Sequence, residues 1–178
     1  MLRILVWIIM LAGGAAFGLY LDSVLFEKAH AGIGFHSLCF IIGFLLIVLL
    51  IRISKNTGRT LAKYGREGDL KRMETNVLVT RGVYKYMRHP MYLGLFLLPV
   101  SFAFLIGSPS FILIIAPGEI IFMLIMIRFI EEPGAIKKFG KDYVEYKNHL
   151  PWFCFKMHCL KELLKKFEND SDPRDIEA

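Results

Sequence analysis

Charged side chains are absent from two long stretches of the chain, and this absence decides its class. Residues 4–21 and 33–51 contain no aspartate, glutamate, lysine or arginine. Each stretch is long enough to cross about 30 Å of hydrocarbon as a helix. Hydrophobic residues make up 55 % of the sequence, above the roughly 45–50 % of soluble domains. These features exclude a soluble protein and predict an integral membrane protein, whose first stretch we interpret as a retained anchor.

Cysteine is scarce, which excludes a disulfide-based scaffold. Of the three cysteines, Cys39 lies within a predicted span, while Cys154 and Cys159 fall on the side expected to be reducing, so we expect no disulfide. Cys154, His158 and Cys159 are close together in the sequence. Three neighbouring residues without a fourth ligand make a weak zinc signature, and we expect no metal.

A third apolar region, residues 91–129, is about twice as long as one span needs. Residues 107–110, Gly-Ser-Pro-Ser, interrupt it, which predicts a helical hairpin with spans at 91–106 and 111–130. The sequence therefore predicts an all-α polytopic bundle of four spans, with room for a fifth. We expect one domain over residues 1–168 and a disordered tail at 169–178. The parts of that domain are two N-terminal spans (1–53), a cytoplasmic loop (54–90), the hairpin (91–130) and a C-terminal segment (131–168).

Basic residues are nearly absent from two of the three predicted loops. Residues 52–88 hold ten of the 22 basic residues and residues 128–174 hold ten more. The positive-inside rule therefore predicts cytoplasmic N- and C-termini and a cytoplasmic central loop. This pattern is ordinary for a membrane protein, so we expect no nucleic-acid partner and no obligate protein partner. An even number of spans also places residues 81–92 on the same face as everything after residue 128.

The C-terminal segment has amphipathic character. Ile136, Phe139, Tyr143 and Tyr146 follow helical spacing, which predicts one stripe of a single helix from residue 133. A second stretch places apolar residues opposite lysines; these apolar residues are Met157, Leu160, Leu164 and Phe167. Both stretches suit helices that lie at the cytoplasmic membrane interface.

Two polar clusters flank the hairpin. Arg88 to Tyr92 reads RHPMY, in which Pro90 suits the first turn of a helix and His89 should avoid helical geometry. Arg128, Glu131 and Glu132 share one helical face, as expected of a surface ion pair as well as of a site. Glu119 lies in the middle of a predicted span, where a carboxyl group must be protonated, paired or in a cavity.

Both clusters resemble the isoprenylcysteine carboxyl methyltransferase family and its phospholipid-methyltransferase relatives, in a small prokaryotic-type form. The shared pattern is G-x-Y-x-x-x-R-H-P-x-Y-x-G, then R-x-x-E-E, then F-G-x-x-Y-x-x-Y and a late proline. It is present here at residues 82–94, 128–132, 139–146 and 151. The first two spans are similar to the family only in being apolar.

The resemblance implies a methyl transfer from S-adenosylmethionine at the membrane interface, in the cell membrane if the host is prokaryotic. It implies that Arg128 faces the acceptor and that Glu132 contacts the cofactor. We take Arg128, Glu131 and Glu132 as the candidate catalytic residues, and Glu119 with Arg128 as the candidate acceptor-binding residues. The residues implied to hold the cofactor are Asn76, Val77, Leu78, Val79, Tyr84, His89, Pro90, Met91, Tyr92 and Glu132. Asn76 departs from the pattern, because the family has a histidine at this position.

The resemblance leaves the acceptor open. The carboxylate of a C-terminal isoprenylcysteine is the first expectation, and Arg128 would then hold it by a two-pronged hydrogen bond. An amine of a membrane lipid is the alternative, for which Glu131 or Glu119 would have to act as base. Sterol-reductase-type proteins have a similar RHPxYxG stretch and use NADPH, so a membrane reductase is a further alternative. A non-catalytic membrane protein with this fold is the last.

Overall fold

The protein is a bundle of helices, seen here in a computed structural model that describes residues 2–25, 32–68 and 75–165. All regular elements in these ranges are helical, which confirms the predicted all-α class. The α-helices are α1 (Leu2–Leu25), α2 (Ile33–Tyr64), α3 (Pro90–Ile106), α4 (Ala116–Met126), α5 (Glu132–Phe139), α6 (Lys141–His149) and α7 (Met157–Leu164). The described residues also contain three shorter turns. One is a 3₁₀ turn, η1 (Gly82–Lys85), and two are π-helical, η2 (Phe111–Ile115) and η3 (Ile127–Glu131).

Three helices in the described residues are long and apolar enough to cross a membrane: Leu5–Leu25, Ile33–Tyr64 and Phe111–Phe139. The apolar helix α3 is shorter, with 17 residues, so four spans stay a prediction. Helix α2 continues to Tyr64, well into the segment 54–90 expected as a loop. The expected tail at 169–178 lies outside the described residues.

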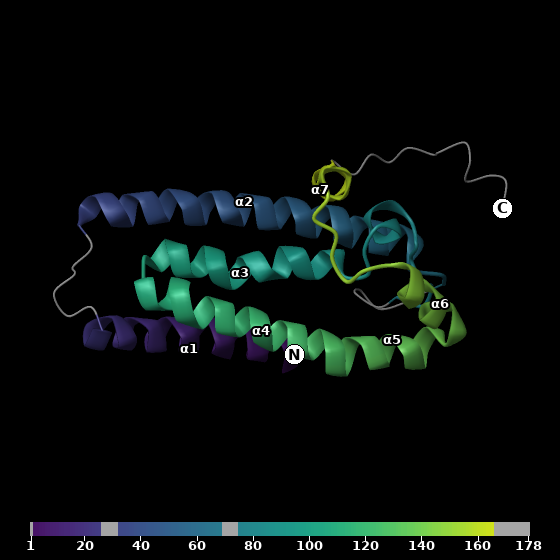
Figure 1. Ribbon diagram of the computed structural model, residues 1–178, viewed down its shortest axis with the longest axis horizontal. Coiled ribbons are helices and arrows are strands. Elements are labelled where there is room, and N and C mark those ends of the chain that lie inside the picture. The colour runs from purple at the N-terminus through teal and green to yellow at the C-terminus, as the bar shows by residue number, and fades with distance from the viewer. Residues whose placement is uncertain (1, 26–31, 69–74, 166–178) are drawn as a thin grey trace.

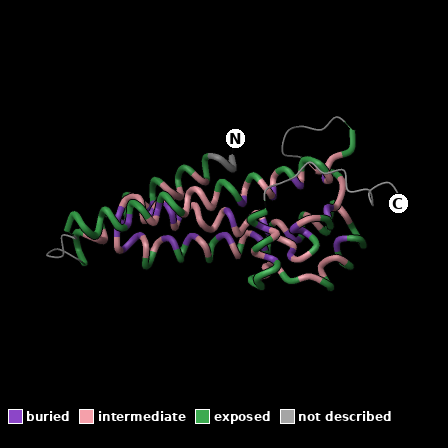
Figure 2. Tube along the Cα trace, turned by 90° about the horizontal axis from the view of Figure 1, so that it is seen from above, coloured by how far each residue is buried: buried purple, intermediate pink, exposed green. Residues whose placement is uncertain are grey.

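The long helices run side by side, and the polar end of the bundle carries the remaining elements. In Figure 1, α2 lies along α3, and α1 lies along the helix that contains α4. Helix α6 and the turn η1 lie at one end, beyond the start of α3, and α7 lies beside α2, level with that start. Figure 2 shows buried backbone both between the long helices and within this end of the molecule.

Helices α2 and α3 approach closely because of a glycine. A Cβ atom placed on Gly43 would lie 2.8 Å from the backbone N of Leu105 and 2.9 Å from the backbone O of Ser101. Small residues allow such close backbone contact between membrane helices, where packing rather than hydrophobic burial drives association. Gly43 therefore fixes how α3 lies on α2.

The expected break at residues 107–110 is confirmed. Gly107 ends α3 with φ of 69°, and its N–H donates to the carbonyls of Ala103 and Phe104, both at 3.0 Å. This is a left-handed helix end that glycine adopts without strain. Across the bundle, Asp22 of α1 accepts a hydrogen bond from the backbone N–H of Ser110 at 2.8 Å, which caps the helix that follows.

The second half of the hairpin is a single helix from Phe111 to Phe139, although proline occurs twice within it. Pro117 follows the π-turn η2, and Pro133 follows the π-turn η3. A proline ring clashes with the carbonyl four residues earlier in an α-helix, and the wider π-turn provides the space. The expectation that a new helix starts at Pro133 is therefore wrong.

The C-terminal stripe is divided between two helices. Gly140, with φ of 61° and ψ of −131°, ends α5 and precedes α6, so the single helix predicted from residue 133 is wrong. Phe139, Tyr143 and Tyr146 still face one cavity, because the turn brings α6 back beside α5. In α7 the buried residues are Cys159 and Leu163. Met157 and Leu164 of the predicted apolar face are exposed, so a contact of this face with the membrane stays a prediction.

We expect Gly43→Ala to destabilise the protein by about 1–3 kcal/mol, the usual cost of overpacking, because the new Cβ would clash with the backbone of α3. The matched control is Gly58→Ala in the same helix, where a Cβ meets nothing within 4 Å. That change should be neutral or stabilising, since alanine forms helix better than glycine. Melting temperatures of the detergent-purified proteins measure both; equal effects would contradict this account of the α2–α3 contact.

Candidate functional site

A cavity of about 200 Å³ lies at the polar end of the bundle. Segments distant in sequence build it: the end of α2, residues 75–79, η1, residues 88–89 just before α3, η3, α5 and α6. Its lining includes the predicted site residues Val77, Leu78, Val79, Tyr84, His89 and Glu131. It also includes seven residues outside the predicted set: Leu61, Thr75, Arg88, Ala135, Phe139, Tyr143 and Tyr146.

The segment before η1 is fixed to the end of α2. The backbone N–H groups of Asn76 and Val77 donate to the Gly65 carbonyl at 2.9 and 3.3 Å. The Asn76 side chain makes two hydrogen bonds with the backbone of Glu67, each 2.8 Å long. Asn76 therefore holds the wall of the cavity in place, and its amide is already engaged in the structure.

The start of α3 is held by the C-terminal segment. The backbone N–H groups of Arg88 and His89 donate to the carbonyls of Pro151 and Trp152 at 3.0 and 3.1 Å. Pro90 is the first residue of α3, as predicted. His89 has φ of −122° and ψ of 51°, which avoids the α region as expected of a residue before proline.

Glu132 is the centre of the polar network, with a side chain only 1 % exposed. Its Oε1 atom lies 2.5 Å from an Arg88 nitrogen, 3.3 Å from His89 Nε2 and 3.4 Å from the Tyr143 hydroxyl. Its Oε2 atom lies 2.8 Å from Lys147 Nζ and 4.0 Å from an Arg128 nitrogen. A buried carboxylate requires such partners to remain charged. Glu132 thus contacts three residues that line the cavity, Arg88, His89 and Tyr143, but is not itself one of the lining residues.

The two tyrosines of the pattern F-G-x-x-Y-x-x-Y are Tyr143 and Tyr146 of α6, and their hydrogen bonds explain their spacing. Tyr143 bonds Glu132, while the Tyr146 hydroxyl donates to the Tyr84 carbonyl at 2.5 Å. Burial is the main cause that raises the pKa of Tyr143 to about 12, with the Glu132 charge adding to it. Both rings therefore stay neutral and fasten α6 over η1.

Two buried polar atoms of the cavity wall have no hydrogen-bond partner among the described residues. They are the Tyr84 hydroxyl oxygen and Arg88 Nε, and both residues line the cavity. Burial raises the pKa of Tyr84 well above its ordinary value, with the neighbouring Tyr146 as a second cause. Unpaired buried polar atoms are costly, so these two atoms are available to hydrogen-bond a polar group that enters the cavity.

The structure does not bring every predicted residue to the cavity. Pro90, Met91 and Tyr92 lie beside it at the start of α3, and the Tyr92 ring meets the His89 ring edge-on at 6.0 Å. Arg128 lies on the same helix as Glu132 with a side chain 58 % exposed. Glu119 is buried against Gly14 of α1, about 20 Å along the helix axis from Glu132 at 1.5 Å per residue.

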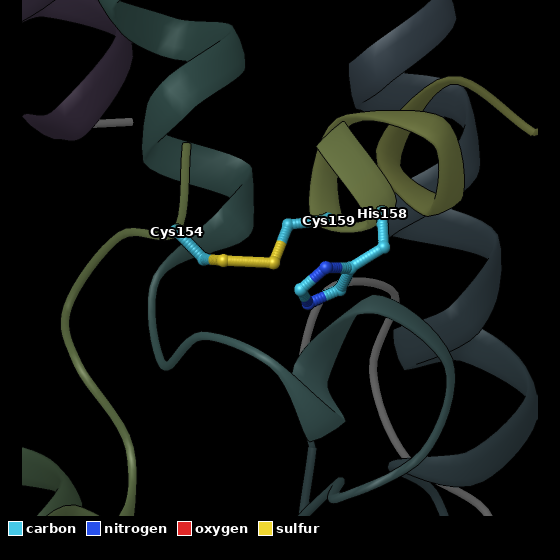
Figure 3. A group of neighbouring side chains, drawn as sticks. All are labelled: Cys154, His158 and Cys159. Carbon is cyan, nitrogen blue, oxygen red and sulfur yellow. A yellow bond between two sulfur atoms is a disulfide. The ribbon is translucent and has the colours of Figure 1, made fainter. Parts of the chain in front are cut away.

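The expectation of no disulfide is wrong, because the structure joins Cys154 to Cys159, with Cα atoms 5.9 Å apart (Figure 3). The chain after Trp152 turns back into α7, which places the two cysteines within normal disulfide distance. The redox compartment alone could not predict this geometry. His158 lies beside the pair, but with both sulfur atoms bonded to each other we assign no metal to the group.

The fold and the site together define an all-helical membrane protein with a polar, aromatic-lined cavity at one end of its bundle. Residues 38–142 match the Phospholipid methyltransferase family, which is more than half of the chain. The protein therefore belongs to the phospholipid methyltransferase family.

Named relatives confirm the resemblance to isoprenylcysteine carboxyl methyltransferases. The protein-S-isoprenylcysteine O-methyltransferase of Saccharomyces cerevisiae is 30 % identical over 124 residues, 62 % of this chain and 46 % of the yeast protein. That of Dictyostelium discoideum is 40 % identical over 77 residues, 43 % of this chain and 32 % of its own length. The human enzyme is 31 % identical over 87 residues, 46 % of this chain and 28 % of its own length. The chain spans less than half the length of these relatives.

A solved structure shows a similar fold. It is the eukaryotic intramembrane Ras methyltransferase ICMT (isoprenylcysteine carboxyl methyltransferase), with a TM-score of 0.55 and 22 % identity. The match covers 82 % of this chain and 51 % of that one. The likeness supports a helical membrane fold of this type for the present chain.

His89 should make stability depend on pH. Burial lowers its pKa, and this outweighs the opposing effect of Glu132. Since the folded pKa lies below the unfolded value of about 6.5, the stabilisation is complete above that value and is lost as pH falls through the folded pKa. We expect His89→Gln to flatten the decline in melting temperature between about pH 7.5 and 5. Parallel pH profiles of the two proteins would contradict a buried neutral His89.

Proposed function

We propose that this protein is an integral membrane methyltransferase that uses S-adenosylmethionine to methylate the carboxylate of a C-terminal isoprenylcysteine. The observation that carries the proposal is the cavity with its two unpaired polar atoms, on Tyr84 and Arg88. Three stretches of the family pattern, residues 82–94, 128–132 and 139–146, contribute side chains to its lining. The names of the relatives favour this acceptor over a lipid amine.

The lining of the cavity suits a ligand with an adenosine group and a positive sulfur. Residues 77–79 offer apolar side chains and backbone groups for the adenosine end. The rings of Tyr84, Tyr143 and Phe139 offer aromatic faces, to which cations are attracted. The volume of about 200 Å³ is below the roughly 300–1,000 Å³ of typical ligand pockets, so the ligand would also extend through the open side.

The charged groups suit the polar end of the donor. Arg88 has an unpaired Nε and can meet a carboxylate, and His89 lies beside it. Glu132 would receive the ammonium group, as the resemblance implies, once part of its present network rearranges. Asn76 would contribute through its backbone, since its side chain is bonded to Glu67.

Arg128 would hold the acceptor. Its side chain is 58 % exposed and makes no hydrogen bond to the described residues, so the planar set of N–H donors on its guanidinium remains available for a carboxylate. Bound S-adenosylmethionine supplies a methyl group on a sulfonium, and transfer to a carboxylate oxygen forms one C–O bond, breaks one S–C bond and releases no proton. The protein therefore needs to position and orient the acceptor rather than to provide a base. Glu119 is not part of this proposal, given its place in the bundle.

Ligand-induced stabilisation tests the proposal. S-adenosylhomocysteine should raise the stability of the detergent-purified protein by about 2.7 kcal/mol at a hundredfold excess over its dissociation constant. NADPH should have no effect. Stabilisation by NADPH alone would instead support a membrane reductase. A panel of acceptors, from a farnesylated cysteine analogue to ethanolamine lipids, then distinguishes carboxylate from amine methylation.

Two substitutions should separate the donor and acceptor roles. Glu132→Gln should weaken S-adenosylhomocysteine binding roughly tenfold, because hydrogen bonds to charged groups contribute about 1.5–3 kcal/mol. Arg128→Ala should raise the acceptor KM by a similar factor and leave donor affinity unchanged. Calorimetry measures the first effect and initial rates the second. Glu145→Gln on the exposed face of α6 serves as the control, and wild-type values for both site variants would refute the assignment.

A further inference from the structure

Lys147 and Arg128 approach the same oxygen of Glu132 from different parts of the chain. Lys147 belongs to α6 and lies 2.8 Å from Oε2, whereas Arg128 belongs to η3 and lies 4.0 Å from it. The other oxygen, Oε1, faces Arg88, His89 and Tyr143, which line the cavity. The Oε1 atom of Glu132 therefore faces residues that line the cavity. Its Oε2 atom faces Arg128 and Lys147, which we call the second side of the network.

The two cations on the second side are accessible and have spare hydrogen-bond donors. The Arg128 side chain is 58 % exposed and that of Lys147 is 27 % exposed, in contrast to 8 % for Arg88. Arg128 makes no hydrogen bond to the described residues, and Lys147 uses its ammonium group on Glu132 alone. An ammonium group has three donors and a guanidinium has five, so most of them are available to a ligand.

The balance of charge also favours an anion at this place. Three permanent cations, Arg88, Arg128 and Lys147, surround Glu132, and Glu131 is the neighbouring carboxylate in the sequence. The group carries one positive charge more than these two carboxylates neutralise. An acceptor carboxylate would balance it, whereas a protonated amine would be repelled by Arg128 and Lys147.

We propose that Lys147 is a second acceptor-binding residue, which together with Arg128 forms a two-cation clamp for a carboxylate group. The Oε2 atom of Glu132 pairs with both cations, Lys147 at 2.8 Å and Arg128 at 4.0 Å, and keeps them on the same side of the network. The clamp lies next to the cavity because the same carboxylate also contacts Arg88, His89 and Tyr143, which line the cavity. This inference rests on the proposed function and adds to it a means of selecting anionic acceptors over amines.

The test compares ligands that differ only in charge. N-acetyl-S-farnesylcysteine carries the carboxylate, and its primary amide has the same shape without the charge. In the presence of S-adenosylhomocysteine, the wild-type protein should bind the acid more tightly than the amide. Lys147→Gln should reduce this preference roughly tenfold, the range expected for a charge-assisted hydrogen bond. It should leave the affinity for S-adenosylhomocysteine within about twofold, because glutamine can still bond Glu132.

Three further variants complete the design. Lys147→Arg keeps the charge and should restore most of the preference for the acid. Lys141→Gln removes an exposed lysine at the start of the same helix and should bind like wild type. Arg128→Gln combined with Lys147→Gln should abolish the preference altogether. In turnover, Lys147→Gln should raise the acceptor KM far more than it lowers kcat.

Each outcome decides between defined alternatives. If S-adenosylhomocysteine fails to stabilise the wild-type protein, the proposed function fails. If it binds but Lys147→Gln keeps the wild-type preference for the acid, the clamp is refuted and the proposed function stands. The clamp is also refuted if Lys147→Gln weakens acid, amide and donor equally, or if phosphatidylethanolamine is the better acceptor.

A measurement on the wild-type protein covers the case in which Lys147→Gln does not fold. Amine-selective acetylation followed by mass spectrometry reports the accessibility of Lys147 and Lys141. The farnesylated acid should protect Lys147 at least severalfold and leave Lys141 unchanged, and the amide should protect neither. Equal labelling of Lys147 with and without the acid would overturn the clamp.

Discussion

The polar end of this protein depends on one buried carboxylate. Glu132 is 1 % exposed and yet charged groups from three segments surround it: Arg88 before α3, Arg128 on its own helix and Lys147 of α6. Removing one member of such a buried network usually costs several kcal/mol, because the partner is left unpaired in a poorly solvated place. Because Lys147 of α6 and Arg88 before α3 both pair with Glu132, α6 is held close to the start of α3. This arrangement encloses the cavity.

The membrane helices provide the platform on which that network forms. Gly43 sets the distance between α2 and α3, and the π-turn η3 lets one helix continue from the membrane past Pro133. In a regular α-helix the ring of Pro133 would clash with the carbonyl four residues earlier and would kink or break the helix. The wider π-turn avoids this clash. The π-turn also determines which face of the helix Arg128 and Glu132 present, so the proline and the site are physically linked.

Sequence reasoning predicted the parts of this structure that depend on local pattern. Apolar runs predicted the helices, and Gly-Ser-Pro-Ser predicted the break at residues 107–110. The even number of spans predicted that residues 81–92 lie on the same face as everything after residue 128. It failed where the result depends on three-dimensional packing: helix continuity through Pro133, the division at Gly140, and the disulfide between Cys154 and Cys159. Arg88 and Lys147 were missed as network members because each is one of many basic residues whose charge the topology already explains.

The two oxygens of Glu132 give the proposed function its geometry. Oε1 contacts residues of the cavity that would take the donor, and Oε2 contacts the two cations that would take the acceptor. In the proposed function, one carboxylate would thus fix the relative position of the donor and acceptor sites, which is the main requirement of a displacement reaction that needs neither acid nor base. It also accounts for the unequal exposure of the cations. Arg88, beside the cavity, is 8 % exposed, whereas the side chains of Arg128 and Lys147 are 58 % and 27 % exposed and would be accessible to the proposed acceptor.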